Sequence, residues 1–118
     1  MAFLRNSLLV LAGIALSAGT AGASTLESGR EAFLIELPSG CRLDVQSPVE
    51  DFEVFTATCS QQAYARVYVG NAPDRSIRGR LLRTRYSWPT YVQAWSLSVP
   101  HDQARADRIA HSVKLKRR

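Results

Sequence analysis

The sequence is poor in the residues that usually build catalytic and metal centres. Its 118 residues include only two Cys and two His, and the cysteines lack the C-x-x-C spacing of a zinc or redox motif. It also has no G-x-S-x-G nucleophile elbow and no phosphate-cradling glycine-rich loop, because Gly40, Gly70 and Gly79 each stand alone. We therefore predict no catalytic residue, no metal site and no cofactor, and expect a protein that is not an enzyme.

The two histidines and the one acidic cluster do not change this expectation. His101 and His111 fall on one predicted helix, with rings about 15 Å apart along its axis, too far apart to share a metal ion. We expect a helix-capping His101 and a surface or boundary His111. The cluster of Glu50, Asp51 and Glu53 matches no calcium loop, so we expect it to lie in a solvated turn.

Long hydrophobic runs are absent as well. The apolar stretch 7–16 has ten residues, whereas a membrane-spanning helix, the alternative reading, needs about 20. Arg5 precedes this stretch and small residues ending in Ala23 follow it, which is the pattern of a secretory signal peptide. We expect residues 1–23 to be cleaved after Ala23, and residues 24–118 to form one small domain that is periplasmic or secreted. With no cysteine near this site, a lipid anchor is not expected.

An exported chain with two cysteines is expected to form a structural disulfide. Cys41 and Cys59 both fall on the apolar face of a predicted strand, because apolar and polar residues alternate around each of them. Closing a loop between positions 18 apart stabilises a fold by about 3 kcal/mol in a chain-entropy treatment. The alternative, a redox or metal pair, lacks the spacing and the neighbouring histidines.

Period-2 alternation predicts strands through most of the chain, and one helix is predicted after Val99, with an apolar stripe from Ala106 to Val113. Short links between strands predict an α+β fold, in which the helix packs on a mostly antiparallel sheet of about five or six strands. We expect 24–30 to be frayed and the basic tail 114–118 to lack order. The predicted strands are 33–37, 41–46, 52–60, 63–70, 80–88 and 91–99, with short connections at 61–62 and 89–90.

Four segments resemble the strands and closing helix of small exported bacterial PsbP-like domains: AFLIELPSGC, DFEVFTATC, AYARVYVGNAP and ARADRIAHSVKL. The resemblance covers much of 33–113 and rests on strand ends and the helix stripe. It implies a sheet with a closing helix and a protein that binds partners rather than catalysing a reaction. Some small exported bacterial domains are immunity proteins that neutralise toxins. The resemblance transfers no catalytic residue, and this chain is shorter than a typical PsbP-like domain.

Basic residues are concentrated in the second half of the chain. Residues 24–60 carry two basic and seven acidic side chains, whereas residues 61–118 carry twelve and three. Five arginines fall within 75–85 and aromatic residues follow them, a composition typical of interface hot spots. We therefore predict a partner-binding segment on the strand 80–88 and the loop before it. Its residues are Arg75, Arg78, Arg80, Arg83, Arg85, Tyr86 and Trp88.

These features predict an exported, non-catalytic binding protein that contacts an acidic protein partner, of which an immunity protein is one form. The alternative is an envelope-surface binder, in which the same arginines and the basic tail contact anionic lipid or polysaccharide. A solvated basic strand face beside buried aromatics fits the pattern equally well. Nucleic acid is not an expected partner of an exported chain, and a small hydrolase, the third hypothesis, lacks its motifs.

Overall fold

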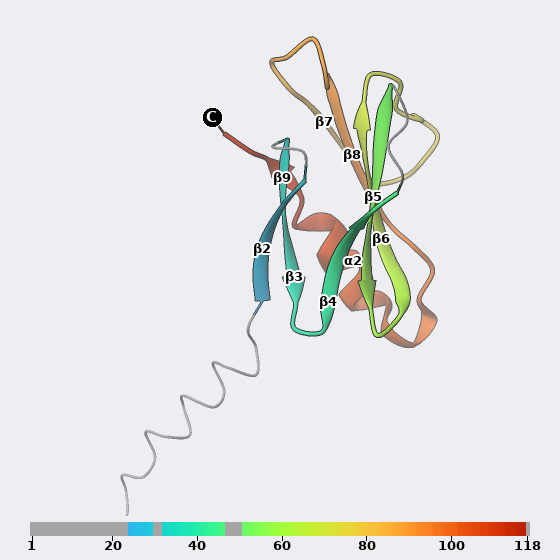
Figure 1. The fold of residues 1–118 in the computed structure, drawn as a ribbon. Helices are drawn as coiled ribbons and strands as arrows, with labels where there is room; N and C mark the ends of the chain where they lie inside the picture. The colour runs from blue at the N-terminus through green and yellow to red at the C-terminus, as the bar shows by residue number, and fades with distance from the viewer. Residues whose placement is uncertain (1–23, 30–31, 47–50, 118) are drawn as a thin grey trace, which may run out of the picture.

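The computed structural model describes residues 24–29, 32–46 and 51–117, so the expected signal peptide, 1–23, lies outside the described residues. Within them the chain forms two antiparallel sheets and one α-helix (Figure 1). None of the helices in these ranges is long and apolar enough to cross a membrane. The five-stranded sheet has the order β4-β5-β6-β8-β7 and the three-stranded sheet the order β2-β3-β9. The elements are β2 (Ser24–Gly29), β3 (Phe33–Pro38), β4 (Cys41–Val45), β5 (Phe52–Cys59), β6 (Gln62–Gly70), β7 (Arg80–Arg83), β8 (Tyr91–Ser96), a 3₁₀-helix η1 (Pro100–Asp102), α2 (Gln103–His111) and β9 (Lys114–Leu115).

The fold is richer in strands than the predicted α+β class, and the strands divide between two sheets instead of one. The division occurs between β3 and β4, where Gly40 adopts φ +87°, a left-handed conformation that favours glycine. On β3 the alternating side chains of Phe33, Ile35 and Leu37 are fully buried. Phe33 meets Phe55 of β5 edge-on at 5.2 Å between ring centroids, so β3 packs against the face of the larger sheet instead of extending its edge.

The two outer strands of the small sheet, β2 and β9, contradict the prediction that these parts of the chain lack order. The prediction is that 24–30 is frayed and 114–118 lacks order, and of these segments residues 30 and 118 lie outside the described residues. β2 pairs with β3 over six register positions, and β9 pairs with the other edge of β3. Lys116 N–H continues this ladder by donating to Ala32 O at 3.0 Å. Strand pairing needs only backbone groups and a partner edge, which composition does not report.

The hairpin between β5 and β6 is confirmed, with its turn one residue earlier than the predicted connection 61–62. Ser60 and Gln61 form a two-residue turn with φ values of 48° and 67°, the pattern of a type I′ hairpin. The paired register places Phe55, Ala57, Ala65 and Val67 on the face that covers the core.

The predicted disulfide is confirmed. Cys41 and Cys59 lie opposite each other on β4 and β5 and are joined by their sulfurs. Replacing both by Ala is expected to lower the free energy of unfolding by about 3 kcal/mol, because the unfolded chain regains the freedom of the closed loop. Urea unfolding followed by circular dichroism measures this loss, with reduced wild-type protein as the control. Unchanged stability in both samples would contradict the assigned role.

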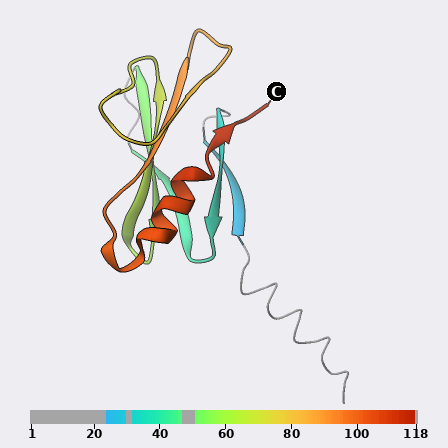
Figure 2. The same cartoon turned by 180° about the vertical axis from the view of Figure 1, so that it is seen from behind.

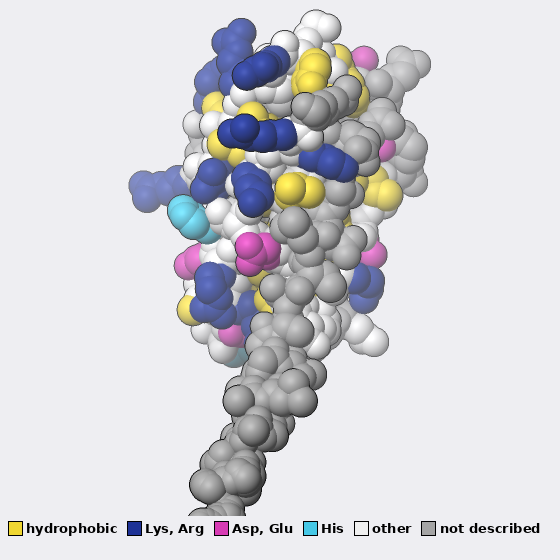
Figure 3. All heavy atoms as spheres, turned by 90° about the vertical axis from the view of Figure 1, so that its left-hand side faces the viewer, with side chains coloured by type: hydrophobic (Ala, Val, Ile, Leu, Met, Phe, Trp, Pro, Cys, Tyr) yellow, Lys and Arg dark blue, Asp and Glu magenta, His cyan; other side chains and the backbone are white. Residues whose placement is uncertain are grey.

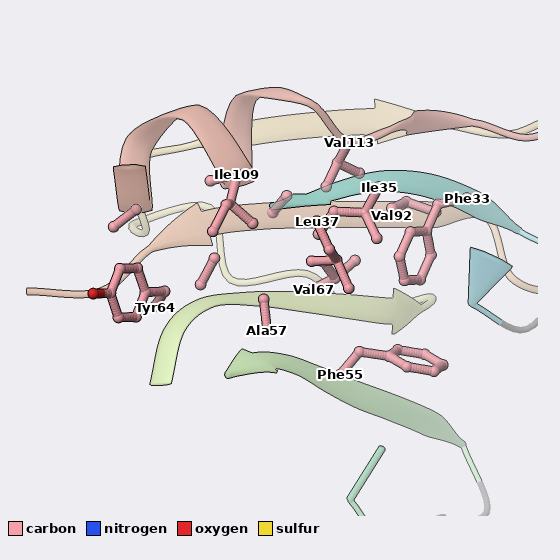
Figure 4. Packing of buried hydrophobic residues seen from close by; sticks show 14 of the residues in the cluster. Phe33, Ile35, Leu37, Phe55, Ala57, Tyr64, Val67, Val92, Ile109 and Val113 are labelled. Atoms are coloured by element: carbon pink, nitrogen blue, oxygen red, sulfur yellow. The ribbon is translucent and has the colours of Figure 1, made fainter. Parts of the chain in front are cut away.

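The predicted helix stripe is also confirmed. Ala106, Ile109 and Ala110 are buried on α2, and Val113 beyond its end is fully buried. Figure 2 shows α2 lying across the strands and leading into β9. Figure 4 shows Ile109 and Val113 pointing towards side chains of β3, β6 and β8, so one hydrophobic core serves both sheets and the helix.

Hydrogen bonds to the Asp107 carboxylate connect α2 to the end of β8. Asp107 Oδ1 accepts hydrogen bonds from Ser96 Oγ at 2.7 Å and from Gln103 Nε2 at 3.0 Å, and these bonds lower the pKa of Asp107 below its ordinary 3.8. The carboxylate therefore stabilises the fold above pH 3.8, and this contribution is lost as pH falls through the lowered pKa.

Ser96→Ala is expected to raise the pKa of Asp107 back towards 3.8, because it removes the bond that lowers the pKa most. A carboxyl-carbon NMR titration measures the pKa directly. Ser98→Ala, at an exposed position two residues further on, is the matched control and should leave the titration unchanged. An unmoved pKa in the Ser96 variant would show that the hydroxyl does not hold the carboxylate.

Candidate binding groove

The predicted strand 80–88 is wrong beyond Arg83, where β7 ends. Thr84 N–H donates to Thr90 O at 2.7 Å, and Thr84 Oγ1 donates to Pro89 O at 2.5 Å and accepts from Tyr86 N–H at 3.0 Å. The first bond continues the β7–β8 pairing by one position, and the two bonds of the hydroxyl satisfy Tyr86 N–H and Pro89 O, which a longer strand would pair across a ladder. Arg85, Tyr86 and Trp88 consequently lie in a folded connection, 84–90, instead of on a strand or in a tight turn at 89–90.

The five arginines of the predicted segment are not brought together on one surface. Val92 and Ala94 of β8 face the core, so Tyr91 lies on the opposite, outer face of the sheet. Arg75 and Arg83 both lie over the Tyr91 ring, with guanidinium carbons 5.3 and 5.8 Å from its centroid. These two arginines therefore already engage an aromatic ring of their own sheet.

The loop 71–79 is held against the outer face by a buried glutamine. Gln93, 2% exposed, donates from Nε2 to Asp74 O at 2.7 Å and accepts from Asp74 N–H at 3.1 Å. A Cβ at Gly79 would collide with Ala94 O, so only glycine permits this close approach. Arg78 is exposed on the same loop, away from the inner face of β7.

The inner face of β7 lines a groove of about 600 Å³ between the two sheets. Its other walls are the connection 84–90 and the chain from β9 onwards. Leu82 and Leu115 contribute apolar surface from opposite sides. Five of its side chains are basic, and no Asp or Glu is found among the described residues that line it. The basic ones are Arg80, Arg85, Lys114, Lys116 and Arg117.

Of the predicted segment, Arg80, Arg85 and Tyr86 line the groove, whereas the basic tail was given a binding role only in the envelope-surface alternative and was not joined to these residues. The signal of the tail was present, because Lys114 and Lys116 alternate with Val113 and Leu115 in the pattern of a short strand. Pairing of β9 with β3 brings this segment opposite β7, although the two are separated by the whole of β8 and α2 in sequence.

Arg80 and Trp88 fix the walls of the groove. Arg80 Nη1 donates to His111 O at 3.1 Å, where the C-terminal end of α2 favours a cation. The Nε of Arg80 is buried and has no hydrogen-bond partner among the described residues. Trp88 Nε1 donates to Asp51 O at 3.1 Å, which ties the connection 84–90 to the start of β5.

The remaining predicted features lie apart. His101 is exposed in η1 and His111 is exposed at the end of α2. Within the described ranges, no three His, Cys, Asp or Glu side chains gather where they could hold a metal ion. Of the acidic cluster expected in a solvated turn, Glu50 lies outside the described residues and Asp51 is exposed in a turn just before β5, but Glu53 is a half-buried residue of β5 itself.

Figure 3 shows the side of the molecule on which the small sheet lies. Lys and Arg side chains crowd the upper half of this view, with hydrophobic side chains between them.

No protein-family model, curated protein or solved structure matches the chain. The resemblance to PsbP-like domains therefore stays a prediction.

Proposed function

We propose that this chain is an exported binding protein whose groove recognises an acidic segment of a protein partner. The observation that carries the proposal is the set of five basic side chains around one concave surface, without a carboxylate among its described lining. An acidic partner brings carboxylates to this concentration of basic side chains, and opposite charges attract.

The chemistry of the lining favours recognition of carboxylates. Arg80 and Arg85 carry guanidinium groups, which bind carboxylates with two parallel hydrogen bonds, and the lysines add flexible point charges. Leu82 and Leu115 provide apolar surface beside these charges. A charged rim around an apolar centre excludes water from the contact and is typical of protein interfaces.

The shape favours a protein segment over an extended anionic surface. A groove receives a chain of a few residues, whereas a lipid or polysaccharide surface contacts protruding side chains. The outer-face arginines Arg75 and Arg83 already lie on Tyr91, which reduces what they offer to a flat surface. The anionic envelope surface is thus the second outcome of the test below.

Export is part of the proposal. A disulfide such as Cys41–Cys59 is typical of proteins in oxidising compartments, and the segment 1–23 has the pattern of a signal peptide. The partner would then be met in the periplasm or outside the cell. An immunity protein that binds an acidic surface of a secreted toxin is one concrete form of this function.

The proposal is tested with a fluorescein-labelled, glutamate-rich peptide, a lysine-rich peptide of equal length, and phosphatidylglycerol vesicles. We expect fluorescence anisotropy to show binding of the acidic peptide at low ionic strength, weakening steadily as salt screens the charges. The lysine-rich peptide should not bind. If the protein sediments with the vesicles but does not bind the acidic peptide, the envelope alternative is favoured. If it binds neither of them at low salt, the proposal is refuted.

A further inference from the structure

Two strand edges flank the groove. β7 is the last strand in the order β4-β5-β6-β8-β7, and β9 is the last in the order β2-β3-β9. Both contribute lining residues to the groove, Arg80 and Leu82 from one and Lys114 and Leu115 from the other. Among the described residues, each of these strands has a single neighbouring strand.

The pairing of β7 with β8 determines which backbone N–H and C=O groups of β7 point to the edge that has no neighbouring strand among the described residues. Thr84 N–H donates to Thr90 O, so this position and every second one before it face β8. In the register of β7, these positions are Leu82, opposite Val92, and Arg80, opposite Ala94. The N–H and C=O groups of Leu81 and Arg83 therefore point away from β8, towards the outer edge.

The side chains of β7 follow the complementary alternation. Arg80, Leu82 and Thr84 line the groove, while Leu81 and Arg83 lie on the outer face. A strand added at this edge would place alternate side chains in the groove. Those side chains would meet a cation at Arg80, an apolar surface at Leu82 and a second cation from Arg85 near Thr84.

We propose, resting on the proposed function, that the partner binds as an extended acidic segment that adds an antiparallel strand to the outer edge of β7, as every described ladder of this fold is antiparallel. Its groove-facing residues follow the pattern acidic, apolar, acidic at every second position. Its other residues donate and accept backbone hydrogen bonds with Leu81 and Arg83. This mode of recognition takes affinity from the main chain and specificity from the alternate side chains.

The positive charge beside β7 indicates which kind of strand binds at its outer edge. Basic side chains at a strand edge discourage pairing with another copy of the same edge, because like charges would then lie opposite one another. A second copy of β7 would bring the arginines of one copy, Arg80 and Arg83, close to those of the other. An acidic strand reverses this repulsion and is the occupant that the groove fits.

The test uses a peptide whose every second residue is Thr and whose intervening residues are, in order, Glu, Val and Glu. Two N-methylated forms of this peptide are compared with it. Methylation of the Thr nitrogens should weaken binding at least about tenfold, because those N–H groups would donate to β7. Methylation of the Glu and Val nitrogens should leave affinity nearly unchanged, since those groups point away from β7. Charge and composition are identical in the two forms.

Amide hydrogen exchange gives a second measurement on unmodified protein. Binding should slow exchange at Leu81 and Arg83 and leave Leu82, already directed at β8, unchanged. Equal affinity of the two methylated peptides would overturn strand addition while leaving the groove as an acidic site. Failure of all three peptides to bind at low salt would overturn strand addition and the proposed function together.

Discussion

Phe33→Ala is expected to lower the free energy of unfolding by about 3–5 kcal/mol, the cost of a large buried aromatic replaced by a methyl group. Phe33 is fully buried on β3 and meets Phe55 of β5 at 5.2 Å. This contact joins the small sheet to the large one, so its loss leaves a cavity between the layers. A domain of this size has about 5–15 kcal/mol to lose, so the variant would approach its limit of stability.

Urea unfolding followed by circular dichroism measures the effect. Leu34→Ala is the matched control, because Leu34 is the next residue of the same strand, only half-buried, and its side chain points to the other side. We expect the control to lose less than half as much stability. An equal loss in the two variants would show that Phe33 has no special role in joining the sheets.

The double charge reversal Arg85→Glu with Arg117→Glu is expected to weaken binding of the acidic peptide about a hundredfold, or about 2.7 kcal/mol. Both side chains are exposed and line the groove from opposite walls. Reversal replaces attraction to the peptide with repulsion at both positions. Neither residue is part of the core, so the melting temperature should change little.

The matched control is Arg78→Glu with Arg108→Glu, which changes the net charge equally at two exposed positions away from the groove. We expect only a few-fold weakening from the altered overall field. The comparison also separates the groove from the arginine-rich segment of the sequence, because Arg78 belongs to that segment and not to the groove. Equal weakening by both double variants would show that net charge alone attracts the peptide.

Local patterns in the sequence were enough to predict several features of the fold. Alternation placed Cys41 and Cys59 each on the apolar face of a strand, and the structure joins them. The helical stripe of Ala106, Ile109 and Ala110 marked the face that is buried. These features depend on neighbours within a few residues, which is the range over which a sequence pattern carries structural information.

The buried face of the predicted strand 91–99 could not be predicted in the same way. In the predicted strand 91–99, alternation groups Tyr91 and Trp95 with the apolar Leu97 and Val99 on one face. In the structure β8 ends at Ser96, Val92 and Ala94 are buried, and Tyr91 and Trp95 lie on the outer face. Both alternate sets contain apolar residues, so the pattern alone cannot choose between them. Pairing with Val67 and Val69 of β6 makes the choice.

The candidate site depended on the same long-range pairing. The predicted segment treated its arginines as one surface, because they are close in sequence. The β7–β8 register sends Arg83 to the outer face and Arg80 to the groove, and the short β9 ladder brings Lys114 opposite. A site made by two strand edges from different sheets is visible only when both sheets are known.

The most direct test of the groove as the binding site is an NMR titration of isotope-labelled protein with the acidic peptide. The structure predicts that the largest amide shifts fall on Arg85, Leu115 and Arg117 around the groove, while Arg75 and Tyr91 on the outer face move little. Shifts centred on Arg75 and Tyr91, with the groove unchanged, would contradict the account.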